Sequence, residues 1–185
     1  PAMAFDNCLR AIERGIPVVS GTTGWTDRQP ELRARCEAGE GTVFWSSNFS
    51  IGVNLFLQIN RRVAALMQAA PNYHLSMDET HHIHKLDAPS GTAITLAEAI
   101  LSERPELKGW ELTEEPHTGL LPITAHREGE VPGIHTVTYT SEVDRIVLTH
   151  EAFGRQGFAL GAVLAAEFAH THQGWLTMDD MLQLG

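Results

Sequence analysis

Two short apolar runs near the start of the chain each end in a cluster of small polar residues, and this feature restricts the fold most. Residues 16–20 end in the turn Gly21 to Gly24, and residues 42–45 end in the segment 46–50. Apolar residues over 5–12 have helical spacing, so a helix precedes the first run. Alternation of helices with buried strands favours α/β architecture with a parallel sheet. Ligands of open α/β sheets bind at the carboxyl ends of the strands, so both polar clusters are candidate binding segments.

The middle of the chain has a different pattern, which predicts a sheet with helices on one side. Apolar and polar residues alternate from Tyr73 onward, as in a strand with one buried face. Residues 109–133 contain three prolines and four glycines, which indicates loops and short strands. This part therefore favours an α+β fold. The spacing predicts helices over 27–39, 52–69, 91–103 and 156–170, strands over 73–82, 134–139 and 145–150, and a short helix after Thr177, which forms a capping-box pattern with Asp180.

Composition and charge narrow the class of protein. Hydrophobic residues make up 43% of the 185 residues and charged residues 19%, which suffices for a core. The 13 basic and 23 acidic side chains give a net charge of −10, so neither nucleic acid nor an anionic membrane is expected as a partner. No apolar stretch reaches the roughly 18 residues of a membrane span. The cysteines, Cys8 and Cys36, make no disulfide scaffold and fit a reducing, cytoplasmic location.

The segment 79–92 is the densest cluster of chemically active residues. It contains three of the ten histidines and Lys85, one of only two lysines. If a strand runs through the segment, alternation places His81 and Lys85 on one face, where both converge on one ligand. An ammonium close to an imidazole lowers both pKa values, which makes either group a proton donor near neutral pH. The pair is therefore a candidate acid–base site.

A helix start follows directly. Ser90 is a favourable N-cap residue, and Gly91 leaves the first turn unobstructed. The backbone N–H groups of Gly91 and Thr92 then point toward a ligand at the positive end of the helix dipole. A carboxylate or phosphate is the expected guest, so an anion site is predicted a few residues from the His/Lys pair.

Other interpretations of these motifs remain open. His81, His82 and His84 are possible metal ligands, although zinc usually needs a fourth ligand and the cysteines are distant in sequence. The histidines are also compatible with an ordinary exposed surface. The turn Gly21 to Gly24 is by itself a weak signal, because such turns commonly only join a strand to a helix.

One long motif identifies a resemblance to a known family. The stretch His81-His82-x-His84-Lys85-x-Asp87-Ala88-Pro89-Ser90-Gly91-Thr92-Ala93 resembles the signature of the dihydrodipicolinate (4-hydroxy-tetrahydrodipicolinate) reductases of the diaminopimelate route to lysine. Other segments are similar to that family in order and spacing, so the resemblance covers nearly the whole chain. These segments are Gly21-Thr22-Thr23-Gly24, Asn48-Phe49-Ser50-x-Gly52-Val53-Asn54, His117-Thr118-Gly119, Gly133-x-His135, and Arg155 with Gly157-Phe158-Ala159 and Gly161-Ala162.

The resemblance implies a reaction and a role for each matching residue. The family reduces a cyclic C=C–C=N dicarboxylate by hydride transfer from NADPH or NADH and then protonates the product. The resemblance makes His81 the proton donor or acceptor and Lys85 a second donor. It makes His82 a substrate-binding residue, with Gly91 and Thr92 around one carboxylate. The implied cofactor contacts are Gly21, Thr22, Thr23, Ser46, Ser47, Asn48 and Phe49, and Arg155 is implied as a hinge or cofactor-side residue.

The resemblance also implies the domain organisation. Residues 1–50 and 156–185 are expected to form part of a Rossmann-like nucleotide domain, in α/β architecture. Residues 51–155 are expected to form an α+β substrate and tetramerisation domain with a mixed sheet, and the family implies a homotetramer. The family begins with a strand and a Gly-rich phosphate-binding turn that this sequence does not contain. We therefore expect the C-terminal portion of such an enzyme, with weakened affinity for the cofactor.

Two functions from other classes compete with the reductase. The first is a non-catalytic fragment that binds a dicarboxylate and forms oligomers, because the phosphate-binding turn is missing. The second is a metal-dependent hydrolase that uses the histidine cluster. Binding of a nicotinamide cofactor separates the reductase from the fragment, and bound zinc would separate the hydrolase from both.

Overall fold

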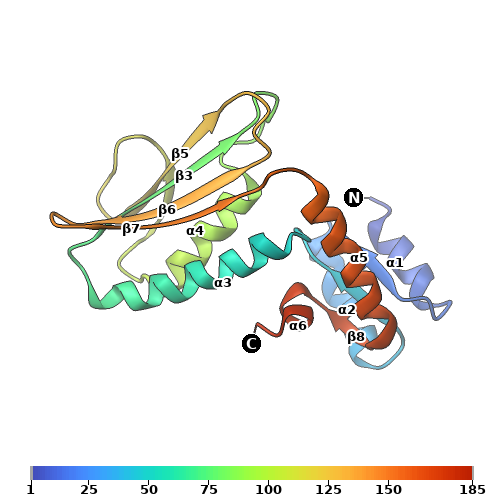
Figure 1. Ribbon diagram of the computed structural model, residues 1–185. Helices are drawn as coiled ribbons and strands as arrows, with labels where there is room; N and C mark the ends of the chain where they lie inside the picture. Colours follow the sequence, from blue (N-terminus) through green and yellow to red (C-terminus); the bar gives the residue numbers. More distant parts are fainter. Residues whose placement is uncertain (1, 185) are drawn as a thin grey trace. The chain divides into compact units, whose positions relative to one another are not determined.

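The computed structural model describes residues 2–184, which form two compact units (Figure 1). The terminal unit combines the residues up to Asn54 with those from Gln156 onward. The central unit comprises Leu55–Arg155. The chain therefore leaves the terminal unit once, completes the central unit and returns. No helix within residues 2–184 is both long and apolar enough to cross a membrane.

The terminal unit contains a parallel sheet with helices on both faces. Within the described residues the sheet has three strands in the order β1-β2-β8, and both pairings are parallel. Alternate residues of β2 point to opposite faces of the sheet and belong to two separate core clusters. Val43 packs with α1 and α2, whereas Phe44 packs with α5. The elements are α1 (Ala4–Ile12), β1 (Val18–Ser20), the 3-10 turn η1 (Thr26–Arg28), α2 (Gln29–Glu37), β2 (Thr42–Trp45), α5 (Gln156–Thr171), β8 (Gly174–Leu176) and α6 (Met178–Leu182).

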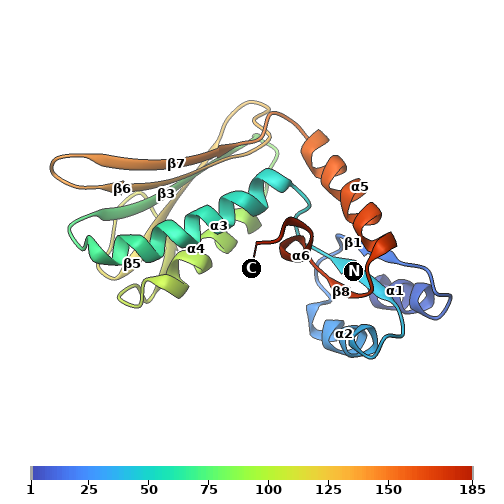
Figure 2. The same cartoon turned by 60° about the horizontal axis from the view of Figure 1, so that its bottom comes forward.

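The central unit contains a mixed sheet with both long helices on one face (Figures 1 and 2). Among the described residues the strand order is β4-β5-β3-β6-β7. The pairs β4–β5 and β3–β5 are parallel, and the pairs β3–β6 and β6–β7 are antiparallel. The elements are α3 (Ile51–Leu66), η2 (Met67–Ala69), β3 (His74–His81), α4 (Gly91–Glu103), β4 (Gly109–Leu112), β5 (Leu120–Arg127), β6 (Ile134–Thr140) and β7 (Arg145–Glu151).

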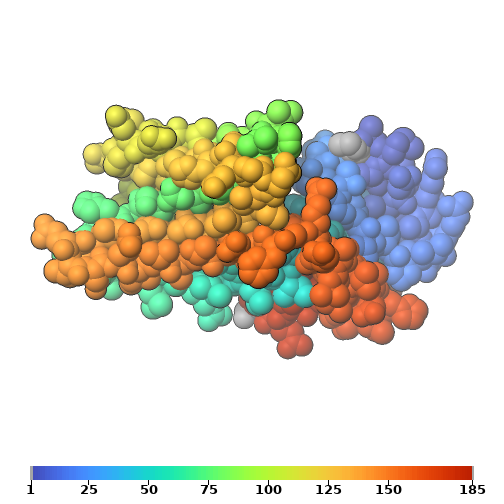
Figure 3. Space-filling view, turned by 45° about the horizontal axis from the view of Figure 1, so that its top comes forward, coloured from blue at the N-terminus to red at the C-terminus, as the bar shows by residue number. Residues whose placement is uncertain are grey.

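Alternation along the strands separates a buried face from an open one. Met77, Ile123 and Val137 are neighbours across β5, β3 and β6, and all three are buried against α3 and α4. The edge strand β7 is exposed over most of its length, and Figure 3 shows its orange residues uncovered along the surface. Side chains with the parity of Met77 therefore point into the space between the sheet and the helices.

The predicted fold class is confirmed, since the chain combines an α/β part with an α+β part that has a mixed sheet. The helix predicted over 91–103 forms with these bounds, and Thr177 and Asp180 form the predicted capping box. One expectation was wrong, and one strand had not been predicted at all. β5 is an eight-residue strand between β4 and β3 within 109–133, where loops and short strands were predicted, and β8 is the strand that had not been predicted. Both β5 and β8 form by pairing with a strand distant in sequence, and local spacing does not reveal such pairing.

Candidate active site

Strand register brings four polar side chains to the helix-covered face of the central sheet. Glu79 and His81 lie two residues apart on β3 and so point to the same face. His135 of β6 is directly opposite Glu79, and Arg127 of β5 is opposite His81. Cross-strand neighbours share a face. Their parity is that of buried Met77, so these polar groups lie where the sheet meets the helices.

Glu79 is the centre of this cluster. Its side chain is 0% exposed, and a charge buried in this way needs partners. The backbone N–H of Ser90 donates to both carboxylate oxygens, at 3.1 and 3.0 Å. Arg127 Nη2 donates to Oε1 at 3.3 Å. The carboxylate therefore joins β3 to β5 and to the start of α4.

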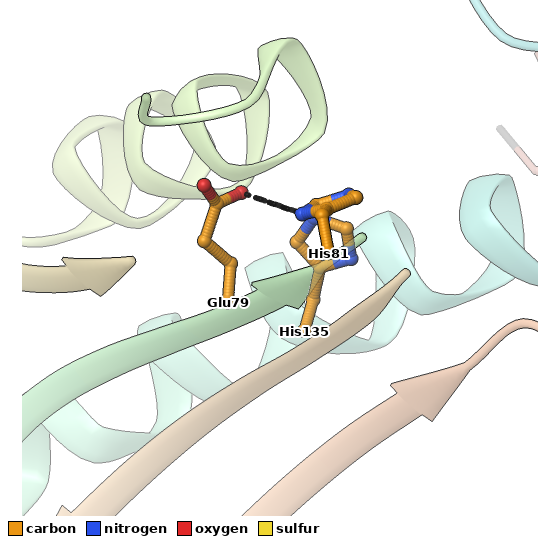
Figure 4. A group of neighbouring side chains, drawn as sticks. All are labelled: Glu79, His81 and His135. Carbon is orange, nitrogen blue, oxygen red and sulfur yellow. Dashed lines mark ion pairs between the residues drawn. The ribbon is translucent and has the colours of Figure 1, made fainter. Parts of the chain in front are cut away.

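His81 and His135 flank the same carboxylate, as Figure 4 shows. His81 Nδ1 is 3.5 Å from Glu79 Oε2, and His135 Nε2 is 3.7 Å from it. Burial lowers the pKa of His81, and the positive charges of Lys85 and Arg127 add to this effect, whereas Glu79 opposes it. Burial lowers the pKa of His135 to about 4, with His81 as a further cause. His135 is therefore neutral at pH 7.

Ser90 connects the histidines to the predicted anion site. It is the N-cap of α4, and its hydroxyl accepts a hydrogen bond from the Ala93 N–H at 3.1 Å. Its Oγ also lies 3.0 Å from His135 Nε2. Gly91 is exposed, and a Cβ added there would have no neighbour within 4 Å. The first turn of α4 is therefore open to a ligand and has its positive dipole end next to the buried cluster.

Lys85 reaches this region from a turn rather than from a strand. β3 ends at His81, and the Lys85 N–H bonds the His82 carbonyl at 3.1 Å, so the expected strand alternation through Lys85 was wrong. The ammonium contacts both oxygens of Asp87, at 2.8 and 2.9 Å, and this contact lowers the pKa of Asp87. Arg127 donates to the carbonyls of Lys85 and Asp87 at 3.3 and 2.7 Å. The loop that carries the lysine is thus held to β5.

The three histidines of the motif do not converge on one point. His81 belongs to the buried cluster, whereas His84 is exposed and contacts Glu130 at 3.2 Å. His82 is half-buried, and its ring centroid is 6.0 Å from that of His84. The metal site considered for His81, His82 and His84 is therefore not formed by these three residues.

A different trio has the composition of a metal site. Glu79, His81 and His135 offer ligand atoms within 4.8 Å of one another. Catalytic zinc needs such lone pairs to be free. Here both Glu79 oxygens accept the Ser90 N–H, the Arg127 guanidinium lies 3.3 Å away, and His135 Nε2 contacts Ser90 Oγ. These contacts favour a hydrogen-bonded network over a metal centre.

The two polar clusters of the terminal unit meet at the carboxyl ends of β1 and β2. Ser20 pairs with Trp45, and the segments that follow touch, because a Cβ added to Gly21 would lie 3.1 Å from the Phe49 ring. The Thr22 carbonyl accepts the indole N–H groups of Trp25 and Trp45, at 2.6 and 3.1 Å. The first turn is therefore held in one conformation.

The second cluster is fixed by its own hydrogen bonds. Ser46 Oγ donates to the Asn48 carbonyl at 2.7 Å, and the Asn54 side chain donates to the same carbonyl at 2.9 Å. Gly21, Thr23 and Ser47 are exposed at this edge. A nicotinamide cofactor fits such a site, which offers a glycine for close approach and polar main-chain groups at strand ends.

Comparison with known proteins identifies the family. The family model described as "Dihydrodipicolinate reductase, C-terminus" matches residues 52–182. A 4-hydroxy-tetrahydrodipicolinate reductase of Christiangramia forsetii is 49% identical over 182 residues, which cover 98% of this chain and 76% of that protein. The chain belongs to the dihydrodipicolinate reductase family. The resemblance inferred from the His/Lys motif is thus confirmed.

More distant relatives of this reductase family agree. A 4-hydroxy-tetrahydrodipicolinate reductase of Archaeoglobus fulgidus is 38% identical, over 97% of this chain and 72% of that protein. A solved structure described as dipicolinate-bound dihydrodipicolinate reductase from Paenisporosarcina sp. TG-14 is 26% identical, with a TM-score of 0.76. It covers 97% of this chain and 69% of that chain. The fold is therefore that of the family along nearly the whole chain.

Only His81 of this cluster was expected from the sequence, which gave no role to Glu79, Arg127 or His135. Arg127 lies in a segment predicted as loops and short strands, and His135 appeared only as part of a family motif. The available signal for His135 was the alternation of buried and exposed residues along β6. His135 alternates with Val137 and Tyr139, which are fully buried, so it had to share their buried face. The register that brings it opposite Glu79 is not encoded locally.

The neutral, buried His135 predicts a loss of stability in acid. Its pKa is near 6.5 in the unfolded chain and about 4 in the folded one, so the unfolded state binds more protons between these values. Stability is therefore full above pH 6.5 and falls as the pH drops toward 4. From pH 7 to pH 5 the loss from this residue is about 2 kcal/mol. Urea unfolding at both pH values measures it.

His135→Gln provides the control for this pH effect, because glutamine does not titrate and keeps a polar atom for Ser90. We expect the variant to lose clearly less stability than the parent between pH 7 and pH 5. Parallel losses in the two proteins would show that His135 does not remain neutral in the folded state.

Proposed function

We propose that the chain catalyses NAD(P)H-dependent reduction of 4-hydroxy-tetrahydrodipicolinate to tetrahydrodipicolinate in the diaminopimelate route to lysine. One observation carries the proposal. The buried imidazole of His81 lies against Glu79, Arg127 holds the loop that carries the Lys85 ammonium, and the open N-terminus of α4 at Gly91 adjoins both. Such a site suits a dicarboxylate that must be protonated, because the site binds an anion beside proton donors. Membership of the reductase family supports the same reaction.

The substrate contacts follow from the anion site. Gly91 and Thr92 present the first N–H groups of α4 to one carboxylate, and His82 binds the substrate next to them. Planar dipicolinate is the ligand named for the solved relative from Paenisporosarcina, and its two carboxylates are the groups this site would bind. The ligand class is accordingly a small cyclic dicarboxylate.

His81 and Lys85 are the residues that we assign to proton transfer. His81 has a lowered pKa, so its imidazole gives up a proton readily near neutral pH. Lys85 contacts Asp87 across an ion pair, and a substrate carboxylate offers the ammonium a second anionic partner. We assign His81 as the donor or acceptor of the proton and Lys85 as a second donor.

The terminal unit would hold the cofactor. We assign the nicotinamide and its ribose to two adjoining segments at the β1–β2 edge. NADPH or NADH supplies the hydride when bound. The chain itself presents a glycine and main-chain groups in fixed positions. Two indole N–H groups fix the Thr22 carbonyl, and the Ser46 hydroxyl fixes the Asn48 carbonyl. The assigned residues are Gly21, Thr22, Thr23, Ser46, Ser47, Asn48 and Phe49, with Arg155 as a hinge or cofactor-side residue.

Domain roles and assembly complete the proposal. We assign residues 1–50 and 156–185 to the nucleotide domain and 51–155 to the substrate and assembly domain, supported by the change of unit at Asn54 and Arg155. We propose a cytoplasmic homotetramer that assembles through the central sheet, supported by the exposed Ile146 and Val147 of β7. The net charge of −10 supports neither nucleic acid nor an anionic membrane as a partner.

Calorimetric titration with pyridine-2,6-dicarboxylate tests the proposed function. We expect binding that strengthens when NADPH is present, because the proposed hydride transfer requires both ligands to be bound at the same time. Gly91→Asp is expected to weaken binding by about tenfold or more, since it places a negative charge at the anion site. Binding that NADPH does not change would contradict the cofactor part of the proposal.

Gly157→Asp is the matched control for the titration. Gly157 lies in the first turn of α5, and like Gly91 it has no atom within 4 Å of an added Cβ. The Gly157→Asp substitution adds the same negative charge at the N-terminus of a different helix. We expect dicarboxylate binding to this variant to equal that of the parent protein. Equal binding by all three proteins would reject the anion site at α4.

A further inference from the structure

The proposed function gives no role to the buried carboxylate of Glu79. A buried charge costs several kcal/mol unless its partners compensate. Apolar side chains fill the neighbouring positions of the same parity, Met77 on β3 and Val137 on β6. A carboxylate at this position therefore differs from its apolar neighbours in what it can bond.

The two oxygens of Glu79 have different surroundings. Oε1 accepts from Arg127 Nη2 at 3.3 Å and from the Ser90 N–H at 3.1 Å. Oε2 shares the Ser90 N–H at 3.0 Å and faces the two imidazoles, His81 and His135. Oε1 thus accepts hydrogen bonds from Arg127 and from the Ser90 main chain. Oε2 has a free lone pair on the side of the histidines.

The hydrogen of His135 does not use that lone pair. Ser90 Oγ accepts from the Ala93 N–H, so its own hydrogen is left for His135 Nε2 at 3.0 Å. A neutral His135, with a pKa of about 4, is then an acceptor at Nε2 and has its hydrogen on the other nitrogen. The lone pair of Glu79 Oε2 remains for His81.

His81 presents one nitrogen to Glu79 and the other to Gly133. Its Nδ1 is buried, has no hydrogen-bond partner within residues 2–184, and lies 3.5 Å from Oε2. Its Nε2 lies beside Gly133, where an added Cβ would approach within 3.2 Å. Any larger residue at position 133 would fill the space next to Nε2. The glycine therefore spares Nε2 a contact that any Cβ at this position would make.

We propose that Glu79 is a positioning residue that holds the imidazole hydrogen of His81 on Nδ1 and leaves Nε2 to exchange the proton with the substrate. The hydrogen bond made by one imidazole nitrogen sets the state of the other. The inference rests on the proposed reductase function for the role of His81. Because the same carboxylate accepts the Ser90 N–H, it also fixes the proton donor relative to the anion site at α4.

Long-range ¹H–¹⁵N NMR of histidine-labelled protein at pH 7.5 tests the tautomer directly. The His81 signals are assigned by their loss in His81→Gln. We expect the hydrogen on Nδ1 in the parent protein. A hydrogen on Nε2 would overturn the inference, and this measurement needs no Glu79 variant to fold.

Glu79→Gln tests the cause. Its single oxygen is expected to stay with Arg127 and Ser90, so that an NH₂ group replaces Oε2 and donates to His81 Nδ1. The hydrogen of His81 then moves to Nε2. Asp78→Asn is the matched control, since Asp78 is adjacent on β3, points to the opposite face and is partly exposed. We expect no change of tautomer in the control. An unchanged tautomer in Glu79→Gln would overturn the inference.

Kinetics separate a positioning role from a structural one. We expect Glu79→Gln to lower kcat by about tenfold or more, with the Kd for pyridine-2,6-dicarboxylate changed less than threefold. Parallel losses of turnover and affinity would assign Glu79 a structural role only and overturn the inference. A parent protein that does not bind the dicarboxylate would reject the proposed function, whereas the NMR result would still show which nitrogen of His81 carries the hydrogen.

Discussion

Replacement of Gly161 by alanine is expected to destabilise the terminal unit by about 3 kcal/mol or more. Gly161 lies on α5, where the helix crosses the segment after β2. An added Cβ would overlap the carbonyl oxygen of Phe49 and lie 2.8 Å from its carbonyl carbon. Both are backbone atoms, so no change of side-chain rotamer relieves the overlap. Either α5 or the Phe49 segment has to move.

Gly157→Ala on the same helix is the control for this prediction. A Cβ at Gly157 meets nothing within 4 Å, and alanine is the better helix former by up to about 1 kcal/mol. We expect unchanged or slightly increased stability in this variant. Chemical unfolding of both variants measures the difference. Similar stabilities would mean that α5 and the Phe49 backbone are not in close contact.

The same substitution is expected to impair cofactor binding in molecules that stay folded. Phe49 packs against Gly21, and both belong to the segments assigned to the nicotinamide. A shift of the Phe49 backbone therefore disturbs this site before the rest of the unit. NADPH titration of folded Gly161→Ala, with Gly157→Ala beside it, distinguishes this local effect from general unfolding.

Lys85→Ala is expected to lower turnover by about 100-fold or more while the affinity for NADPH stays close to that of the parent. The variant lacks the second proton donor, and it also lacks the ammonium that Asp87 contacts. The segments assigned to the cofactor belong to the terminal unit, whereas Lys85 belongs to the central unit. Steady-state rates and NADPH binding, measured on the same preparation, test both parts.

Lys108→Ala is a well-matched control, because the chain has only two lysines and this one is exposed. We expect its turnover to equal that of the parent. An unchanged rate in Lys85→Ala would reject the role of this lysine as a proton donor. A large loss in both variants would point to charge in general rather than to the site.

Local signals in the sequence accounted for the parts of the fold that local interactions determine. Ser90 as an N-cap predicted where α4 begins, and the pair Thr177 and Asp180 predicted α6. The assumption of a strand through Lys85 failed, because the chain turns after His81, where Ile83 bonds the Gly129 carbonyl. That turn depends on a partner more than forty residues away in the sequence, so no local pattern predicts it.

The candidate site was predictable to a similar extent. The His/Lys motif and the helix start were visible, since both lie within one continuous segment. The network around Glu79 was not visible, because Arg127 and His135 reach it only through the pairing of β3 with β5 and β6. The sequence therefore indicated which chemistry to expect, whereas strand register determined which groups control it.

The discontinuous make-up of the terminal unit has a consequence for biosynthesis. β2 needs β8 as a neighbour, and Phe44 is covered by Ala165 and Ala169 of α5. During translation, one apolar face of the early segment therefore stays uncovered until more than a hundred further residues have left the ribosome. The central unit is continuous and can fold first. Until α5 emerges, this face is transiently exposed apolar surface of the kind that promotes aggregation.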